Sequence, residues 1–549
     1  MKRLIFSLLM VGCVASAGAQ LPLAGGTLTG SLESNSIYYL NDSALGEKNI
    51  TFGSNDYLKL AYYNGRWSAG LQGDAYLPAL IGYDDVRNAG GSDYTFALTQ
   101  IYVNYRGEGW DATAGDFFEQ FGSGLVYRSF EDRQLGMNNA TQGARITAQP
   151  TDWLSMKAFA GRPRLAVLTH AGSLLGGVDL SSNLSTLLDM QNVSLSVEGS
   201  YVVRYEDLTK EGSELWGGFN IFEELGLYSP MTHLYSLRGA MSWNNLSVKA
   251  EYVGKTMDIS DNVSMATPGS ALLGEVAYSK GKFNMMTQVR LLNNFGTRLS
   301  LYDLPVESDF GTSKVDAMGN TLNYIPALTR QHTYMLANLE PHQVNTHHEL
   351  AAQTDLYYSI RHKKDRRNFW RFHLNASVAQ NTETQNLSWL DVNFDIERQW
   401  NKDWKATFLY SMQKRNPEKG VRDIIYTSHI LVADLTHKID RRNSLRAELQ
   451  YLYSNDYEGD WAAALVEYNM APALSIFVSD MYNLQRVETA HNRNLEKLHY
   501  YSIGASYTIG NTRAQLSYGR NRAGMVCSGG VCRYTPAYTG FNLLLSSSF

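Results

Sequence analysis

The feature that most constrains this chain is an alternation of polar and apolar side chains, which recurs in segment after segment from about residue 27 to the carboxyl terminus. Successive side chains of a β-strand point to opposite faces of a sheet, so each segment is predicted to be a strand with one apolar face. The segment 390–397 illustrates the pattern, with Leu390, Val392, Phe394 and Ile396 opposite Asp391, Asn393, Asp395 and Glu397. The sequence therefore predicts an all-β protein.

The alternation continues to the last residue. In the stretch 531–549, the residues Phe541, Leu543, Leu545 and Phe549 fall on one face. Such a final strand fits the edge of a soluble sheet as well as the seam of a closed barrel. The connections between strands must distinguish the two.

We expect about 24 strands, within a range of about 20 to 26, from the turn signals that divide the chain. The expected strands cover residues 27–40, 50–63, 65–78, 94–106, 109–118, 140–149, 152–163, 174–188, 191–206, 232–244, 245–257, 270–280, 282–294, 345–360, 367–381, 386–400, 402–415, 423–438, 442–455, 459–470, 472–486, 496–509, 511–524 and 531–549. Every second connection is short, as at Asn64-Gly65, 107–109, Asn244-Asn245 and Gly510-Asn511. The alternate connections are mostly longer, as at 79–93, 119–139, 207–231, 258–269 and 295–344.

A soluble β-sandwich has no reason to keep this parity over so many hairpins. Membrane barrels keep it, because their strands are joined by short periplasmic turns and long extracellular loops. The sequence therefore predicts a single closed transmembrane antiparallel up-and-down β-barrel over residues 20–549. In such a barrel the strand at 531–549 pairs with the strand at 27–40.

The amino-terminal residues 1–19 are predicted to be a secretory signal peptide, with Lys2 and Arg3 before an apolar run and Ala17-Gly18-Ala19 at its end. Cys13 leaves lipid attachment open as an alternative. No later apolar run reaches the length of about 18 residues that a membrane helix needs. The 35 Tyr and 10 Trp suit the aromatic girdles of a barrel. A net charge of −5 gives no basic field for nucleic acid.

The signal peptide, the continuous alternation and the terminal Phe549 together resemble bacterial outer-membrane β-barrels. A narrower resemblance, to a Bacteroidota outer-membrane barrel family of unknown function, rests on residues 30–42, 115–136, 323–341 and 529–536. These likenesses imply a Gram-negative outer-membrane location, contact with outer-membrane lipid, and insertion by the barrel-assembly machinery with Phe549 as the signal. They imply no assigned activity.

One long connection is unusually rich in charge. The segment 115–145 could fold into the lumen as a constriction, with Gly122 and Gly124 permitting the bend. The alternative is a solvated loop with local ion pairs. The candidate constriction residues are Glu119, Arg128, Glu131, Asp132, Arg133 and Arg145. Alternation also predicts lumen-facing charges at Arg66, Asp74, Lys157, Arg238, Lys249, Glu251, Arg290, Arg371, Asp391, Asp395, Glu397, Lys405, Arg446 and Glu448.

Cys527 and Cys532 are predicted to form a loop disulfide in an oxidising compartment, with a metal half-site as the rival reading. The connection 295–344 is long enough to be a partial plug or a docking segment. Its histidines, together with His347, His348 and Glu349, match no metal-ligand spacing. No catalytic or phosphate-binding motif occurs, so we expect neither an enzyme nor a cofactor. A barrel lipase or protease, whose triad is assembled from different strands, stays open as an alternative.

Two functions fit these expectations. The first is a passive, porin-like channel for small solutes, filtered by the inward charges. The second is a non-conducting barrel that serves as a subunit of an outer-membrane assembly, secretion or uptake complex, with its lumen filled by 115–145 and 295–344. Other outer-membrane subunits would then be its partners.

Overall fold

The protein is described by a computed structural model, which covers residues 20–46, 50–83, 95–206, 229–259, 266–300, 304–308, 311–315, 320–456, 459–484 and 497–549. The expected signal peptide, 1–19, lies outside the described residues. So do most of the long connections at 79–93 and 207–231.

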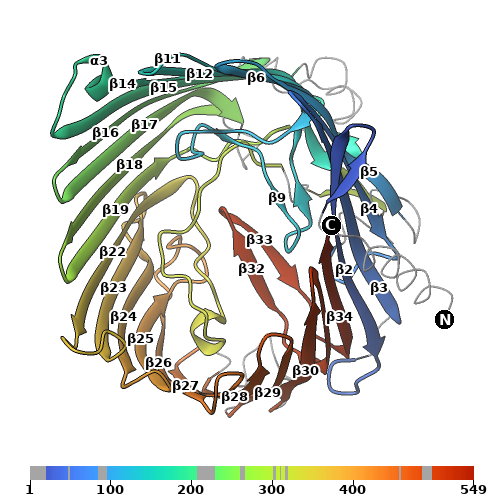
Figure 1. The fold of residues 1–549 in the computed structure, drawn as a ribbon, viewed down its shortest axis with the longest axis vertical. Helices are drawn as coiled ribbons and strands as arrows, with labels where there is room; N and C mark the ends of the chain where they lie inside the picture. The colour runs from blue at the N-terminus through green and yellow to red at the C-terminus, as the bar shows by residue number, and fades with distance from the viewer. Residues whose placement is uncertain are drawn as a thin grey trace.

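Twenty-four long strands form one closed, antiparallel, up-and-down barrel (Figure 1). Its wall strands are β2 (Gly26–Leu40), β3 (Phe52–Asn64), β4 (Trp67–Tyr76), β5 (Thr95–Arg106), β6 (Trp110–Phe117), β11 (Thr141–Thr151), β12 (Leu154–Ala166), β14 (Leu174–Asn183), β15 (Val193–Tyr205), β16 (Met231–Trp243), β17 (Leu246–Ile259), β18 (Ala266–Lys280), β19 (Phe283–Asn293), β22 (His348–Arg361), β23 (Phe369–Asn381), β24 (Leu387–Gln399), β25 (Trp404–Arg415), β26 (Tyr426–Lys438), β27 (Asn443–Ser454), β28 (Trp461–Met470), β29 (Leu474–Asn483), β30 (His499–Ile509), β31 (Thr512–Asn521) and β34 (Tyr538–Ser548). The predicted fold class is confirmed.

The barrel closes where the last strand meets the first wall strand. β34 pairs with β31 on one side and with β2 on the other, in a register that places Phe541 opposite Tyr38. Beyond the strand, the Gly30 N–H donates to the Phe549 carbonyl at 2.8 Å and the Phe549 N–H donates back to Gly30 at 2.9 Å. The expected pairing of the two ends of the chain is therefore present.

The remaining elements are short. β1 (Leu21–Leu23) pairs with β2, and β13 (Thr169–His170) pairs with β12. The others are β7 (Gln120–Phe121), β8 (Tyr127–Arg128), β9 (Glu131–Asp132), β10 (Met137–Asn138), β20 (Leu304–Ser308), β21 (Gly311–Val315), β32 (Gly524–Ser528), β33 (Val531–Thr535), the helix α3 (Leu184–Leu187) and the 3₁₀ turn η1 (Leu336–Asn338). Within the described residues, no helix has the length and apolarity that crossing a membrane requires.

Three expected strands end or begin elsewhere. The strand expected at 174–188 stops at Asn183, because the Asn183 side chain accepts the Thr186 N–H at 3.1 Å and caps α3. The strands expected at 511–524 and 531–549 are shortened to β31 and β34. Between them β32 and β33 form a separate hairpin, which turns at Gly529-Gly530, both at positive φ. Pro536 follows the hairpin and has no N–H to donate to a neighbouring strand.

The outer face of the wall is apolar. Leu237, Leu449 and Phe96 are 63%, 65% and 65% exposed, and each lies on the face that points away from the lumen. Exposure of so many large apolar side chains fits a surface immersed in lipid rather than in water. We call the rim with the short turns the short rim and the opposite one the long rim.

Deleting Phe549 is expected to lower the amount of folded barrel in the membrane severalfold, because it removes the two terminal hydrogen bonds to Gly30 and the ring that covers this glycine. The measurement is the fraction of protein in membranes whose gel mobility changes on boiling. Phe541→Ala is the matched control, since Phe541 is an outward aromatic of the same strand. Equal folded fractions for the two variants would contradict the role of Phe549.

Candidate functional site in the barrel lumen

Within the described residues, at least three connections from the long rim fold into the lumen, where Figure 1 draws them inside the ring of strands. We call residues 118–140 the first lumen segment, residues 320–347 the second and residues 522–537 the third. Each contacts the wall and at least one other lumen segment. The lumen is therefore occupied by the chain itself.

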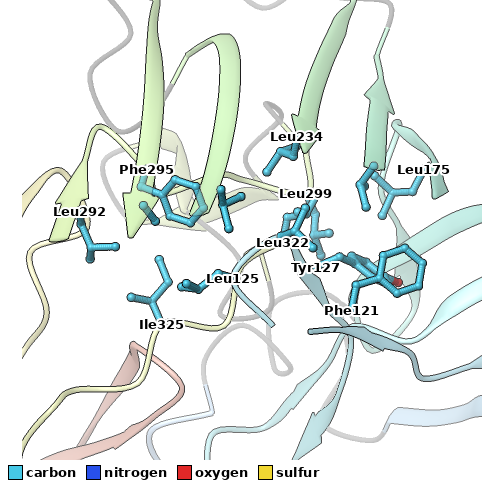
Figure 2. Close-up of a cluster of buried hydrophobic side chains, with 14 of the residues drawn as sticks. Phe121, Leu125, Tyr127, Leu175, Leu234, Leu292, Phe295, Leu299, Leu322 and Ile325 are labelled. Carbon is cyan, nitrogen blue, oxygen red and sulfur yellow. The ribbon is translucent and has the colours of Figure 1, made fainter. Parts of the chain in front are cut away.

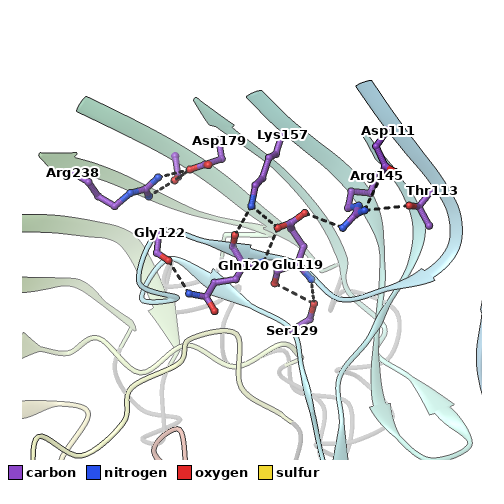
Figure 3. Close-up of polar contacts among 11 residues, drawn as sticks. Asp111, Thr113, Glu119, Gln120, Gly122, Ser129, Arg145, Lys157, Asp179 and Arg238 are labelled. Carbon is purple, nitrogen blue, oxygen red and sulfur yellow. Dashed lines mark hydrogen bonds and ion pairs between the residues drawn. The ribbon is translucent and has the colours of Figure 1, made fainter. Parts of the chain in front are cut away.

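The first lumen segment is anchored by a buried carboxylate. Lys157 of β12 donates to Glu119 at 2.9 Å, and Arg145 of β11 lies 3.4 Å from the other Glu119 oxygen (Figure 3). Arg145 also donates to Asp111 of β6 at 3.0 Å. Glu119 is only 8% exposed, so its charge is balanced by wall cations rather than by water.

A second polar anchor lies further along the same segment. Arg238 of β16 donates to Asp179 at 2.5 Å and to Glu198 at 2.9 Å, and its guanidinium packs against Gly122. A side chain at Gly122 would collide with this guanidinium, and its φ of +55° also favours glycine. The tight approach of backbone to wall therefore depends on this glycine.

The other candidate constriction residues separate into distinct environments. Glu131 accepts from Gln72 at 2.6 Å, and Arg133 pairs with Glu33 at 2.5 Å and with Glu131 at 3.4 Å. Arg128 instead lies over the ring of Tyr324, 3.7 Å from its centroid. Asp132 accepts the backbone N–H groups of Gln134 and Leu135 in a local turn. The structure thus joins Glu119 with Arg145 and Glu131 with Arg133, whereas a constricting role for the set stays a prediction.

Two side chains of the first lumen segment have pKa values above their ordinary ones. Burial raises the pKa of the fully buried Tyr127 to about 12, although the hydroxyl shares a 2.6 Å hydrogen bond with Thr141. For Arg133, burial alone would lower the pKa, but the carboxylates of Glu131 and Glu33 outweigh it and the pKa lies above its ordinary value. Both groups therefore keep their ordinary protonation state near neutral pH.

The second lumen segment is held largely by apolar packing. Figure 2 shows Leu322 and Ile325 among Phe121 and Leu125 of the first segment and wall residues such as Leu234. Further along, Leu336 and its neighbours pack on the wall side chains Leu409, Ile430, Val432, Leu452, Trp461, Ala463 and Met481. The inner wall is therefore apolar beneath both of these parts of the second lumen segment.

Ion pairs fix the second lumen segment both to the wall and to the third lumen segment. Arg330 makes a two-pronged contact with Asp395 of β24, at 2.5 and 2.9 Å. Glu340 lies 3.8 Å from Arg415 of β25 and accepts from Arg522, just after β31, at 3.2 Å. Since Arg290 of β19 also donates to the Pro326 carbonyl, the segment reaches from β19 to the region beside β31.

The third lumen segment is the β32–β33 hairpin, closed by a disulfide between Cys527 and Cys532. The Ile325 N–H donates to the Gly529 carbonyl at 2.9 Å, so the hairpin tip is bonded to the second lumen segment. Gly529 packs against the ring of Tyr324 and leaves no room for a side chain.

A cavity of about 430 Å³ remains between the lumen segments and strands β15 to β19. Arg238, Lys249, Glu251 and Glu275 line it from the wall, and Tyr324 lines it from the second lumen segment. Its charges are paired with one another, as Lys249 is with Glu275 at 2.9 Å. The cavity thus carries charges of both signs on a partly apolar lining.

The histidines of the long connection lie in separate places. His342 contacts Glu349 at 3.1 Å, whereas His332 lies 3.5 Å from Asp391. Among the residues that the structure describes, no three His, Cys, Asp or Glu side chains are grouped so as to hold a metal ion.

Alternation placed most lumen-facing charges on the correct face, including Asp391, Asp395 and Glu448. Arg66 is a correction, because it lies in the turn before β4, where its side chain is 55% exposed and pairs with Glu108 at 2.9 Å. Arg330 and Glu340 were missed as anchors. Their segment has no alternation of polar and apolar residues from which the direction of a side chain could be predicted. Its length and its aromatic residues were the only indications in the sequence that it is ordered.

A closed antiparallel barrel with an apolar outer face is a transmembrane β-barrel. Among solved structures, the P pilus usher PapC translocation pore has a TM-score of 0.41 at 9% identity, over 95% of this chain and 99% of that one. The siderophore receptor PirA from Pseudomonas aeruginosa has a TM-score of 0.40 at 10% identity, over 95% of this chain and 80% of that one. A triple-mutant porin of Rhodopseudomonas blastica has a TM-score of 0.28 at 12% identity, over 65% of this chain and 100% of that one.

The chain belongs to the DUF6029 family, a family of unknown function, which matches residues 1–549. No curated protein matches this chain.

Glu119→Gln is expected to destabilise the barrel by about 1 to 3 kcal/mol, because Lys157 and Arg145 would then face each other without a carboxylate between them. The measurement is the free energy of unfolding in urea from lipid vesicles. Glu108→Gln is the control, since its side chain is 90% exposed and its pair with Arg66 contributes less than about 1 kcal/mol. Equal losses for the two variants would contradict the anchor.

Proposed function

We propose that the protein is an outer-membrane barrel that is closed at rest and serves as a non-conducting subunit of an assembly, secretion or uptake complex. The observation that carries the proposal is the second lumen segment, which bonds to β24 through Arg330 and to the region after β31 through Glu340. A segment that is tied to the wall at β24 and to the third lumen segment beside β31 lies across the path that a solute would take.

The packing of the segment supports a stable closed state. Leu322, Ile325 and Leu336 are at most 3% exposed, and each sits in an apolar cluster with the wall. Moving the segment would expose these side chains to water, at roughly 1.5 to 3 kcal/mol for each. Spontaneous opening would therefore be rare.

A passive channel for small solutes is the second candidate. The cavity beside Arg238, Lys249 and Glu251 favours it, because charged side chains that line a space inside a barrel are typical of a solute path. In this case the lumen segments would narrow the path without blocking it.

Conductance in planar bilayers tests the closed state. The intact protein is expected to give little or no ion current, whereas deletion of 303–340 is expected to give large, stable steps, because it removes most of the second lumen segment. A large steady conductance from the intact protein would overturn the proposal and favour the channel.

A finer test uses the two ion pairs. Arg330→Gln with Glu340→Gln weakens both anchors without changing net charge, and is expected to produce brief openings that the intact protein lacks. Arg66→Gln with Glu108→Gln is the matched control, because it removes a pair of the same charges at the short rim. Identical traces for the two double variants would show that the anchors do not hold the lumen closed.

The subunit role is tested by purification in a mild detergent. A partner present in a fixed ratio to the barrel is expected. Recovery of the barrel alone, from membranes in which it is abundant, would remove this part of the proposal while leaving the closed lumen in place.

A further inference from the structure

Charge is distributed unevenly around the short rim. Four of its connections carry exposed cations: 281–282, 362–368, 400–403 and 439–442. The cations are Lys282, Lys363, Lys364, Arg366, Arg367, Lys402, Arg441 and Arg442, and they outnumber the anions of the same connections, which are Asp365, Asp403 and Asp440. The other short-rim connections carry Arg66 as their one cation, beside Glu108, Asp152 and Asp189. The positive charge is therefore confined to one part of the rim.

The four connections are successive on the rim. Strands β18, β19 and β22 to β27 pair in unbroken order, so each connection neighbours the next. Two strand spacings separate successive turns, which is about 10 Å. We call this surface the basic arc. Its side chains make no ion pair among the residues that the structure describes, so their charge is available to a partner.

Aromatic side chains mark the membrane level beside the basic arc. Trp370, Trp400 and Trp404 are 40%, 42% and 40% exposed, and lie at or next to the ends of β23, β24 and β25. Tryptophan gathers where hydrocarbon gives way to lipid headgroups. The tips of the connections lie a few residues beyond, about 10 Å at the rise of a strand. The cations therefore lie at the depth of the headgroup phosphates.

One further cation faces the lipid directly. Arg398 shares the outward face of β24 with Phe394 and lies over the rings of Trp370, at 4.7 Å, and of Trp400, at 5.7 Å. Its guanidinium donates to the Asn368 side chain at 2.7 Å, in one of the four connections. An outward arginine at the aromatic girdle is within reach of a lipid headgroup and out of reach of a soluble protein below the rim.

We propose that the basic arc and Arg398 form a binding surface for anionic phospholipids of the periplasmic leaflet. A phosphodiester headgroup supplies the negative charge, and its acyl chains lie along the apolar face of β22 to β26. The surface draws such lipids to one side of the barrel and fixes its tilt and position in the membrane. The inference depends on the barrel spanning the outer membrane, and holds whether the lumen is open or closed.

Native mass spectrometry of the purified barrel tests the proposal, with equal amounts of phosphatidylglycerol and phosphatidylcholine added in a mild detergent. The intact protein is expected to retain phosphatidylglycerol preferentially. Changing Lys363, Lys364, Arg366 and Arg367 to Gln is expected to remove most of this preference, by up to about fivefold for each charge at the lipid surface. Arg398→Gln alone is expected to reduce the preference for phosphatidylglycerol by the factor for one charge, up to about fivefold.

The matched comparison uses two double variants. Arg441→Gln with Arg442→Gln removes two charges from the basic arc, and Arg66→Gln with Arg106→Gln removes two from the other side of the same rim. Only the first pair is expected to lower phosphatidylglycerol retention. These two variants also decide the question if the fourfold variant does not fold, which the change of gel mobility on boiling reports.

Equal retention of the two lipids by the intact protein would overturn the proposal, as would equal losses for the two double variants. A third outcome also overturns it. If an acidic periplasmic protein is purified with the intact barrel and lost from the fourfold variant, while lipid retention stays unchanged, the basic arc is a protein-binding surface.

Discussion

The structure depends on backbone hydrogen bonds that have no water to replace them. In the hydrocarbon of a membrane, each unpaired N–H or C=O costs several kcal/mol, so every wall strand needs a neighbour on both sides. The pairing of β34 with β2 supplies the last two missing neighbours at once. Without it, both strands would present an open edge to lipid, and the other pairings could not hold the barrel closed.

Closure with this many strands creates the next requirement. A barrel of 24 strands encloses more space than inward wall side chains can fill. Here three connections from the long rim enter that space and complete the interior. The wall side chains match each segment locally: they are apolar beneath Leu322 and Leu336, and charged beneath Glu119 and Arg330. The inner face thus has the chemistry of a folded core at some places and of a polar pore at others.

The wall was largely predictable from the sequence, because a strand in lipid must alternate and its turns must keep parity. The residues of β33 were mistaken for the start of the last wall strand, since they are equally compatible with it, and those of β32 were taken for a turn. The lumen contacts were harder to predict. Glu119 and Arg145 could be selected by charge density, but the partner of Arg330 lies 65 positions away on a strand whose neighbours are set by the whole barrel. Irregular segments have no period, so nothing local identifies the wall residue that each side chain meets.

The mixture of contacts around the second lumen segment bears on how the barrel could open. Apolar burial at Ile325 and Leu336 opposes any movement into water, and movement would also break the ion pairs of Arg330 with Asp395 and of Glu340 with Arg522. A closed state held by several such contacts is shifted only by a partner that binds the open state more tightly, by about 5.5 kcal/mol to reverse a hundredfold preference. Dissolved small solutes make too few contacts to supply that difference readily. A protein that docks at the long rim, where all three lumen segments leave the wall, can supply it by replacing their contacts with its own.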